Sequence, residues 1–158
     1  MIKVLFVCLG NICRSPMAEF VLKDMVRKIG LEKEFIINSV ATDGGYNARN
    51  NEGIYPDTKA ILKKHNIPFT DRISVEMTKE DYNTYDYILA MDTQNISSIL
   101  KYIESDPKQK VCRLLDYTDT PSDIADPWYY GNFDKTYEDI TKGCKALLKH
   151  ILKTNKLN

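Results

Sequence analysis

The most constraining feature of the sequence is a continuous apolar run at residues 2–8, IKVLFVC, which leads directly into a segment with helical periodicity. A continuous apolar run predicts a strand that is covered on both faces, as in parallel sheets. Strand patterns and helical patterns continue to alternate along the chain. Further strand patterns lie at 34–42, 85–91 and 110–116, and helical patterns lie at 15–30, 55–67, 92–104 and 134–153, with a short one opening at Thr78. The sequence therefore predicts an α/β fold, a parallel sheet with helices on both faces.

Composition and charge narrow the classes of protein that this chain can belong to. At 158 residues it fits one domain, 1–158. Basic and acidic residues balance at 22 each, which argues against a nucleic-acid or membrane partner. No stretch reaches the roughly 20 apolar residues of a membrane span, and the opening run lacks the cleavage site of a signal peptide. With four cysteines, too few for a disulfide scaffold, we expect reduced thiols and a cytoplasmic protein.

The segment 7–20, VCLGNICRSPMAEF, joins the first strand to the first helix and carries a distinctive polar pattern. Ser15, followed by proline, suits the N-cap of the helix. The loop amides, the helix N-terminus and the planar guanidinium of Arg14 can then converge on a tetrahedral dianion. Gly10 permits a backbone conformation that a Cβ would hinder, and Cys8 is expected to ionise beside these positive groups. The pattern predicts a sulfur nucleophile at the base of an anion site; the alternative is a buried strand cysteine, a capping serine and a surface arginine.

Three separated segments resemble those of one known family, the low-molecular-weight protein tyrosine phosphatases. VLFVCLGNICRSPMAEF, at 4–20, is similar to the family's phosphate-binding loop, and TKEDYNTYDYILAMDTQN, at 78–95, to its central segment. DPWYYGNFDKTY, at 126–137, resembles the aromatic loop with the family's catalytic Asp-Pro pair. The resemblance implies a three-layer α/β fold with a four-stranded parallel sheet in the order 2-1-3-4. It also implies hydrolysis of phosphotyrosine in proteins through a cysteinyl-phosphate, without a cofactor or metal.

The resemblance assigns roles to individual residues. Cys8 is the expected nucleophile, and Arg14 is expected to hold the phosphate together with the loop residues Leu9, Gly10, Asn11, Ile12, Cys13 and Ser15. Because a phenol has a pKa of about 10, an acid is needed at the leaving oxygen. The 116–134 stretch offers Asp116, Asp119, Asp123, Asp126 and Asp134. Asp126 is preferred, because it precedes a proline and aromatic residues and matches the family motif, although a turn-forming Asp-Pro explains it by composition alone.

Aromatic side chains are expected to wall a slot for the phosphotyrosine ring. Trp128 and Tyr129 follow the Asp-Pro pair, and Tyr46 is expected on the opposite side, with Tyr55 or Arg49 as alternatives. The 42–56 segment departs from the family's usual pattern, so it is the part least informative about substrate preference. Phosphate and other oxyanions are expected inhibitors, and the protein is expected to be a monomer.

Supporting residues follow from the same resemblance. In the family, the loop asparagine has strained geometry and is held by a serine and a histidine from elsewhere. The matching positions are Asn11 with Ser15, Ser39 and His65. Asp92 and Asn95 match residues that border the site. From the residues alone, His65 reads as a helix C-cap and Asp92 as a helix N-cap.

Two further hypotheses concern regulation. Cys13 is either packed beneath the loop or able to capture oxidised Cys8 as a disulfide. Tyr129 and Tyr130 are candidates for phosphorylation, as the family's adjacent tyrosines suggest.

Three other functions stay open at this point. An arsenate reductase on a related scaffold would need a closely spaced downstream cysteine pair, whereas Cys112 and Cys144 are far apart in the sequence. A non-catalytic phosphotyrosine-binding module would need neither a nucleophile nor an acid. A phosphatase for acyl or sugar phosphates would use the same cysteine and arginine.

Overall fold

Four parallel strands form the centre of the protein, a computed structural model that describes residues 1–42 and 45–157. The strands are β1 (Ile2–Cys8), β2 (Phe35–Ala41), β3 (Tyr87–Ala90) and β4 (Val111–Arg113). Their order in the sheet is β2-β1-β3-β4, and every pairing is parallel. The predicted α/β class and the strand order 2-1-3-4 are therefore confirmed.

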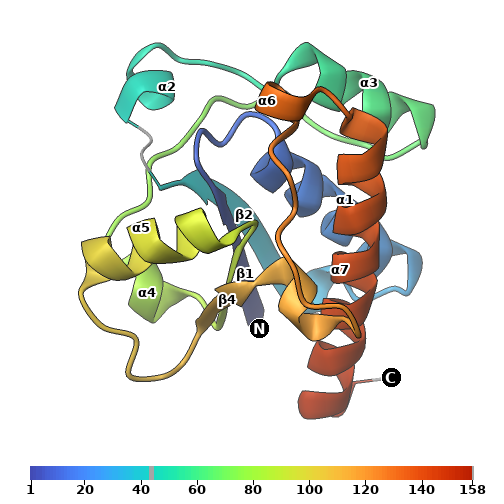
Figure 1. Ribbon diagram of the computed structural model, residues 1–158. Helices are drawn as coiled ribbons and strands as arrows, with labels where there is room; N and C mark the ends of the chain where they lie inside the picture. The colour runs from blue at the N-terminus through green and yellow to red at the C-terminus, as the bar shows by residue number, and fades with distance from the viewer. Residues whose placement is uncertain (43–44, 158) are drawn as a thin grey trace.

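Helices cover both faces of the sheet, which gives three layers (Figure 1). They are α1 (Arg14–Lys28), α2 (Gly45–Arg49), α3 (Pro56–Lys64), α4 (Asp81–Thr84), α5 (Thr93–Ile103), α6 (Pro127–Tyr130) and α7 (Phe133–Thr154), with 3-10 turns η1 (Glu32–Glu34) and η2 (Leu114–Tyr117). Helix α1 packs against α3 and α7 on one face, whereas α5 packs against β3 and β4 on the other. Within residues 1–42 and 45–157, every helix is too short or too polar to span a bilayer.

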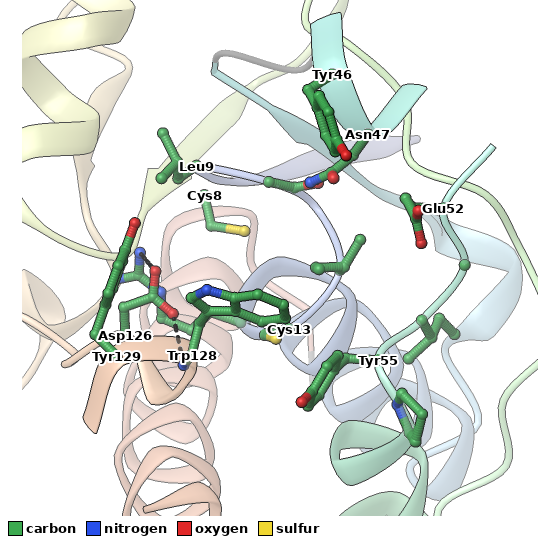
Figure 2. A pocket seen from close by; sticks show the side chains of 16 residues that line it. Cys8, Leu9, Cys13, Tyr46, Asn47, Glu52, Tyr55, Asp126, Trp128 and Tyr129 are labelled. Atoms are coloured by element: carbon green, nitrogen blue, oxygen red, sulfur yellow. Dashed lines mark hydrogen bonds and ion pairs between the residues drawn. The ribbon is translucent and has the colours of Figure 1, made fainter. Parts of the chain in front are cut away.

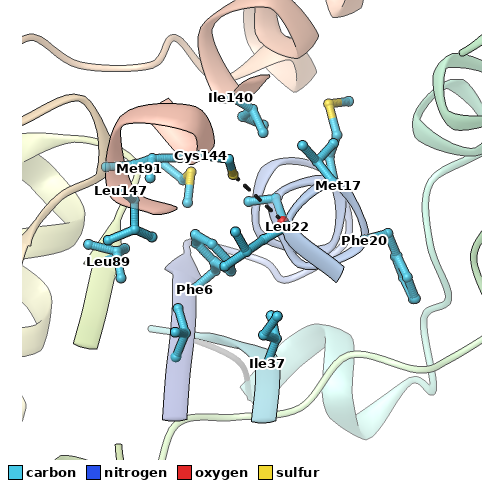
Figure 3. Packing of buried hydrophobic residues seen from close by; sticks show 14 of the residues in the cluster. Phe6, Met17, Phe20, Leu22, Ile37, Leu89, Met91, Ile140, Cys144 and Leu147 are labelled. Atoms are coloured by element: carbon cyan, nitrogen blue, oxygen red, sulfur yellow. Dashed lines mark hydrogen bonds between the residues drawn. The ribbon is translucent and has the colours of Figure 1, made fainter. Parts of the chain in front are cut away.

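The larger core lies between the sheet and the layer of α1 and α7 (Figure 3). Phe6 and Leu89 of the strands meet Met17 and Leu22 of α1 and Leu147 of α7, all of them buried. Burying an aliphatic or aromatic side chain of this kind contributes roughly 1.5–3 kcal/mol. These contacts anchor α1, and with it the loop that precedes this helix.

A second core lies on the opposite face, beneath α4 and α5. It contains Leu5 and Val7 of β1, with Tyr82 and Ile99 from the covering helices. Successive side chains of a strand point to opposite faces of a sheet. Strand β1 is therefore apolar at every position from Val4 to Val7, because both of its faces are buried.

The boundaries of several elements differ from the sequence expectation. Helix α1 begins at Arg14 with Cys13 at its N-cap, and no side chain caps it. Ser15 is therefore not the N-cap; its hydroxyl contacts Cys8 and Asn11 instead. Strand β4 is shorter than predicted, because the chain turns into η2 at Leu114. The two short helices α2 and α6 were not expected.

Candidate active site

A pocket of about 650 Å³ opens beyond the carboxyl end of β1 (Figure 2). In parallel α/β sheets, ligands bind at this edge, where strands end and helices begin. The lining residues are Cys8, Leu9, Gly10, Ile12, Cys13, Arg14, Tyr46, Asn47, Glu52, Gly53, Ile54, Tyr55, Pro56, Asp126, Trp128 and Tyr129. The loop 8–14 thus forms one side of the pocket, and the Asp126 segment forms another.

The Cys8 sulfur lies at the end of β1 and faces the centre of the pocket (Figure 2). The backbone N–H of Asn11 donates to it at 3.3 Å, and the Ser15 hydroxyl lies 3.0 Å away. The Asn11 Nδ2 donates to the Ser15 Oγ at 2.8 Å, so the serine's own proton is free to point toward the sulfur. Both neighbours of the sulfur can therefore donate to a thiolate.

Asn11 holds the loop in a conformation that few side chains accept. Its φ of 56° lies in the left-handed region, where asparagine is among the tolerated residues. Its amide nitrogen donates to Ser15 and to the Ser39 Oγ, the latter at 2.9 Å. Its oxygen accepts from the backbone N–H of Val75 at 3.0 Å and from Arg72 at 2.8 Å. All four hydrogen-bonding positions of the side chain are used, which fixes the loop around Cys8.

The support behind Asn11 is a buried polar cluster of Glu19, Ser39 and Arg72. The Ser39 hydroxyl donates to the Glu19 Oε1 at 2.6 Å, and Arg72 donates to both Ser39 and Glu19. Glu19 is only 3% exposed, and its other carboxylate oxygen accepts from Lys23 at 2.6 Å. The cluster connects α1, β2 and the segment before α4 to the loop.

His65 does not belong to this cluster. It follows the last residue of α3 as its C-cap, and its ring stacks on Tyr137 of α7 with centroids 3.8 Å apart. The end of α3 turns the imidazole toward α7, so the contacts expected from His65 are made by Arg72. The prediction that His65 holds Asn11 is wrong, whereas the helix C-cap alternative is confirmed.

Gly10 has no left-handed φ, and a side chain at this position would instead displace the Asn47 amide that packs against it. The Asn47 Nδ2 donates to the Gly10 carbonyl at 2.9 Å, and the Ser74 Oγ donates to the same oxygen at 3.0 Å. A Cβ on Gly10 would lie 2.5 Å from the Asn47 Nδ2. Sequence reasoning identified neither Asn47 nor Ser74.

Arg14 is almost fully buried beneath the loop. Its Nη1 donates to the Asp92 Oδ2 and to the Ile124 carbonyl, each at 2.7 Å, and its Nη2 lies 3.5 Å from the Asp126 Oδ2. Burial opposes the charge of the guanidinium, but the nearby charges of Cys8, Asp92 and Asp126 outweigh it, so the pKa of Arg14 is raised. The arginine is therefore a fixed cation, oriented by protein groups on its far side.

Asp92 is the helix N-cap that the sequence predicted, and it reaches the pocket only through Arg14, because it does not itself line the pocket. As the N-cap of α5, it accepts the Asn95 N–H at 2.7 Å through Oδ1, while Oδ2 accepts from Arg14. Asn95 does not line the pocket. Its side chain accepts from the Met91 and Asp92 N–H groups at 3.2 Å each, which completes a capping box and holds Asp92 in place.

Asp126 is the N-cap of α6 and also lines the pocket. Its Oδ1 accepts the Trp128 N–H at 3.0 Å, while Oδ2 faces Arg14. Both the turn-forming Asp-Pro and the pocket position are therefore present. Of the other aspartates considered, neither Asp116 nor Asp123 lines the pocket, and both bind Arg113.

Aromatic residues form the outer walls, as Figure 2 shows. Trp128 and Tyr129 stand on one side and Tyr46 on the other; each is more than half exposed. Tyr55 also lines the pocket, packed edge-on against Trp128 with ring centroids 5.1 Å apart. Arg49 is absent from the lining. These aromatic side chains line the same pocket as Cys8.

The other cysteines differ from Cys8 in their surroundings. Cys13 lines the floor of the pocket, where burial and then the charge of Cys8 raise its pKa to about 12. Burial also raises the pKa of Cys112 on β4 and that of Cys144 inside α7. All four cysteines are free thiols. Whether Cys13 captures oxidised Cys8 stays a prediction.

Comparisons with known proteins give a consistent result. A sequence model described as "Low molecular weight phosphotyrosine protein phosphatase" matches residues 3–157. The low molecular weight protein-tyrosine-phosphatase YfkJ of Bacillus subtilis is 40% identical to the chain, with 99% of the chain and 100% of that protein covered. The protein PtpA of Staphylococcus aureus, with the same description, is 38% identical, covering 97% of the chain and 96% of PtpA.

Solved structures agree in fold. The crystal structure of Bacillus subtilis YfkJ superposes with a TM-score of 0.92 at 38% identity, covering 98% of this chain and 96% of that one. The protein tyrosine phosphatase of Entamoeba histolytica, crystallised with Hepes in its active site, superposes with a TM-score of 0.87 at 30% identity. That comparison covers 99% of this chain and 100% of the other.

Proposed function

Because the chain belongs to the low molecular weight phosphotyrosine protein phosphatase family, we propose that it hydrolyses phosphotyrosine in proteins with Cys8 as nucleophile. One observation carries the proposal most directly. The Cys8 sulfur faces a pocket that also receives the Arg14 guanidinium and the Asp126 carboxylate, with these two groups 3.5 Å apart. Nucleophile, phosphate-binding cation and acid therefore act on the same bound group.

In the first step, the Cys8 thiolate attacks phosphorus and the bond to the tyrosyl oxygen breaks. Arg14 and the loop amides stabilise the charge on the equatorial oxygens. Asp126, as the protonated acid, gives its proton to the leaving phenolic oxygen, a contribution on the order of 10²–10⁴-fold. The products are free tyrosine hydroxyl and cysteinyl-phosphate.

In the second step, water attacks the cysteinyl-phosphate. Asp126, now a carboxylate, accepts a proton from that water, and the sulfur leaves as a thiolate. Ser15, 3.0 Å from the sulfur, donates a hydrogen bond to it as the bond breaks. Inorganic phosphate is released and the enzyme returns to its starting state, so no cofactor is consumed.

The walls of the pocket support an aryl phosphate as substrate. Trp128 and Tyr129 present aromatic surface on one side and Tyr46 on the other. The shorter side chain of phosphoserine would not bring its phosphate down to Cys8 while its backbone stays outside these walls. Phosphate, vanadate and similar oxyanions should occupy the loop 8–14 and inhibit.

The whole chain acts as one catalytic unit, and we propose that it works as a monomer in the cytoplasm. The pocket draws its lining from Cys8 near the start to Tyr129 near the end of one chain, so a second copy is not needed to complete it. The four free thiols fit a reducing compartment. Sedimentation at micromolar concentration measures the oligomeric state.

The test is phosphate release from three substrate classes: phosphotyrosine peptides, matched phosphoserine peptides and small acyl or sugar phosphates. The proposal expects turnover of phosphotyrosine far above the others, and a loss of about 100-fold in Asp126→Ala. Tight peptide binding without phosphate release would instead identify a binding module. Thiol-dependent release of arsenite from arsenate would identify a reductase.

A further inference from the structure

The segment that brings Asp126 to the pocket has no regular secondary structure of its own. Between η2 and α6, residues 118–126 form neither helix nor strand. Such a segment is positioned only by the contacts that it makes with rigid elements. The position of the Asp126 carboxylate therefore depends on the residues that attach this segment to the sheet and helices.

Asp123 makes the most concentrated of these attachments. A single carboxylate oxygen, Oδ1, accepts from the Thr93 backbone N–H and the Thr93 hydroxyl, each at 2.9 Å, and from the Arg113 Nη1 at 3.0 Å. Thr93 is the first residue of α5, and Arg113 is the last of β4. Burial opposes ionisation of Asp123, but these hydrogen bonds and the charge of Arg113 lower its pKa.

The next residue extends the attachment into the protein. Ile124 is fully buried, and its N–H donates to the Met91 carbonyl at 2.9 Å. Its own carbonyl accepts from Arg14 at 2.7 Å. The chain thus passes from Asp123, which binds the first residue of α5, through the buried Ile124 to Asp126 at the pocket.

We propose that Asp123 is a positioning residue for Asp126: together with Thr93 and Arg113 it clamps the 118–126 segment to α5 and β4. The inference rests on the proposed function, because it concerns the acid of that reaction. Asp92 at the same helix end orients Arg14. The start of α5 therefore orients both the cation that holds phosphate and the acid that protonates the leaving group.

Positioning of this kind has a specific kinetic consequence. General acid catalysis needs the carboxyl within hydrogen-bond reach of the leaving oxygen, and small misplacements are costly. A poorly acidic leaving group such as tyrosine depends strongly on that proton. A nitrophenol, which is a much stronger acid, depends on it less. Weakening the contacts of Asp123 with Thr93 and Arg113 should therefore slow the hydrolysis of phosphotyrosine more than that of para-nitrophenyl phosphate.

The experiment compares kcat/KM for these two substrates in Asp123→Asn and Arg113→Gln. The two variants break the same ion pair but change the net charge in opposite directions. We expect kcat/KM for phosphotyrosine to fall by about tenfold in both, and by less for para-nitrophenyl phosphate. Inhibition by inorganic phosphate should weaken by a smaller factor than kcat/KM for phosphotyrosine falls, because Asp92 and the loop 8–14, which hold Arg14 and the anion, are unchanged in both variants.

Two controls separate this inference from its alternatives. Asp126→Ala gives the substrate ratio for complete loss of the acid; if wild type does not hydrolyse phosphotyrosine, or this variant leaves the ratio unchanged, the proposed function itself fails. Asp119→Asn changes an exposed aspartate on the same segment and should behave as wild type. Thr93→Val removes one donor to Asp123 and should shift the ratio in the same direction by a smaller factor.

If Asp126→Ala behaves as expected, three outcomes would still overturn the proposal that Asp123 positions Asp126. Loss of folded protein lowers the apparent kcat/KM for both substrates in equal proportion. An unchanged ratio of the two kcat/KM values in Asp123→Asn therefore shows that Asp123 is merely structural. Opposite shifts in Asp123→Asn and Arg113→Gln show an electrostatic effect on the dianion. Phosphate inhibition that weakens by as large a factor as kcat/KM for phosphotyrosine falls shows that Asp123 acts on the anion site rather than on Asp126. If Asp123→Asn does not fold, Arg113→Gln and Thr93→Val give the same measurement.

Discussion

The guanidinium of Arg72 donates to the side-chain oxygen of Asn11 at 2.8 Å, across 61 positions of sequence. The same arginine is paired with Glu19, whose side chain is 4% exposed. The residue that shapes the loop around Cys8 is thus held by a partly buried cation, which is itself paired with a buried carboxylate. Because one guanidinium nitrogen of Arg72 donates to Glu19 and the other donates to Asn11, the planar geometry of this side chain matters as well as its charge.

Replacing Arg72 should separate these two contributions. Among the residues that the structure describes, Arg72→Ala leaves Lys23 as the one ionic partner of Glu19, and it should lower the free energy of unfolding by about 3 kcal/mol. Arg72→Lys keeps the positive charge but loses the two-pronged guanidinium. We therefore expect it to recover most of the unfolding free energy lost in Arg72→Ala, while kcat/KM stays about tenfold below wild type. Urea unfolding and steady-state kinetics measure both. Lys59→Ala, which breaks a surface ion pair with Asp71, is the control and should cost less than about 1 kcal/mol. Full activity in Arg72→Lys would contradict the account.

A pair of substitutions at Asn11 distinguishes backbone conformation from side-chain contacts. Asn11→Gly keeps the left-handed backbone accessible but removes all four hydrogen bonds, whereas Asn11→Ala also strains the backbone by about 1 kcal/mol. We expect both variants to lose kcat/KM, on the order of 10–100-fold, and Asn11→Ala to be the less stable of the two in thermal melts. Wild-type activity in Asn11→Gly would show that the contacts to Ser15, Ser39 and Arg72 do not matter for catalysis.

The cysteines should differ sharply in alkylation. Iodoacetamide reacts with thiolates, and Cys13, with a pKa of about 12, is a protonated thiol at neutral pH. Peptide mass spectrometry after brief treatment at pH 7.5 should find the label on Cys8, with inorganic phosphate protecting it, and none on Cys13. Labelling of Cys13 should appear only at strongly alkaline pH. Faster labelling of Cys13 than of Cys8 would contradict the assignment of the two thiols.

The carboxylate of Glu52 predicts a preference in the residues around phosphotyrosine. Glu52 is exposed and lines the pocket on the side away from Asp126 (Figure 2). A peptide with lysine beside the phosphotyrosine should have a kcat/KM up to about fivefold above that of the matched glutamate peptide, with the difference fading at high salt. Glu52→Gln should narrow the difference and Glu52→Lys should reverse it. Free phosphotyrosine serves as the control and should respond to neither variant.

The sequence was informative where local pattern and physical role coincide. The apolar run of β1 has to be buried on both faces, and the residues from Cys8 to Arg14 are contiguous, so their convergence follows from a strand that leads into a helix. Asp126 precedes a proline and aromatic residues, a pattern that also fits a turn-forming Asp-Pro, and the resemblance to the family motif is what indicated this aspartate as the acid.

The support behind the loop was not predictable in the same way. Arg72 lies outside any helix or strand, between Asp71 and Ile73, and such a position reads as solvated surface. Its partner gave a usable signal: Glu19 lies on a helix face whose neighbours Ser15 and Leu22 are buried. A carboxylate at such a position needs a buried cationic or hydrogen-bonding partner. The identity of that cation depends on the path that the chain takes beside β2, and no local sequence pattern specifies this path.

Isolating the covalent intermediate tests the role of Cys8 as nucleophile most directly. A phosphotyrosine peptide is mixed with enzyme, quenched in acid within one turnover, and the digested protein is analysed for phosphate by mass spectrometry. We expect phosphate on Cys8 in the wild type and none in Cys8→Ser, although that variant should still bind inorganic phosphate. Phosphate on another residue, or full-rate turnover in Cys8→Ser, would contradict that role.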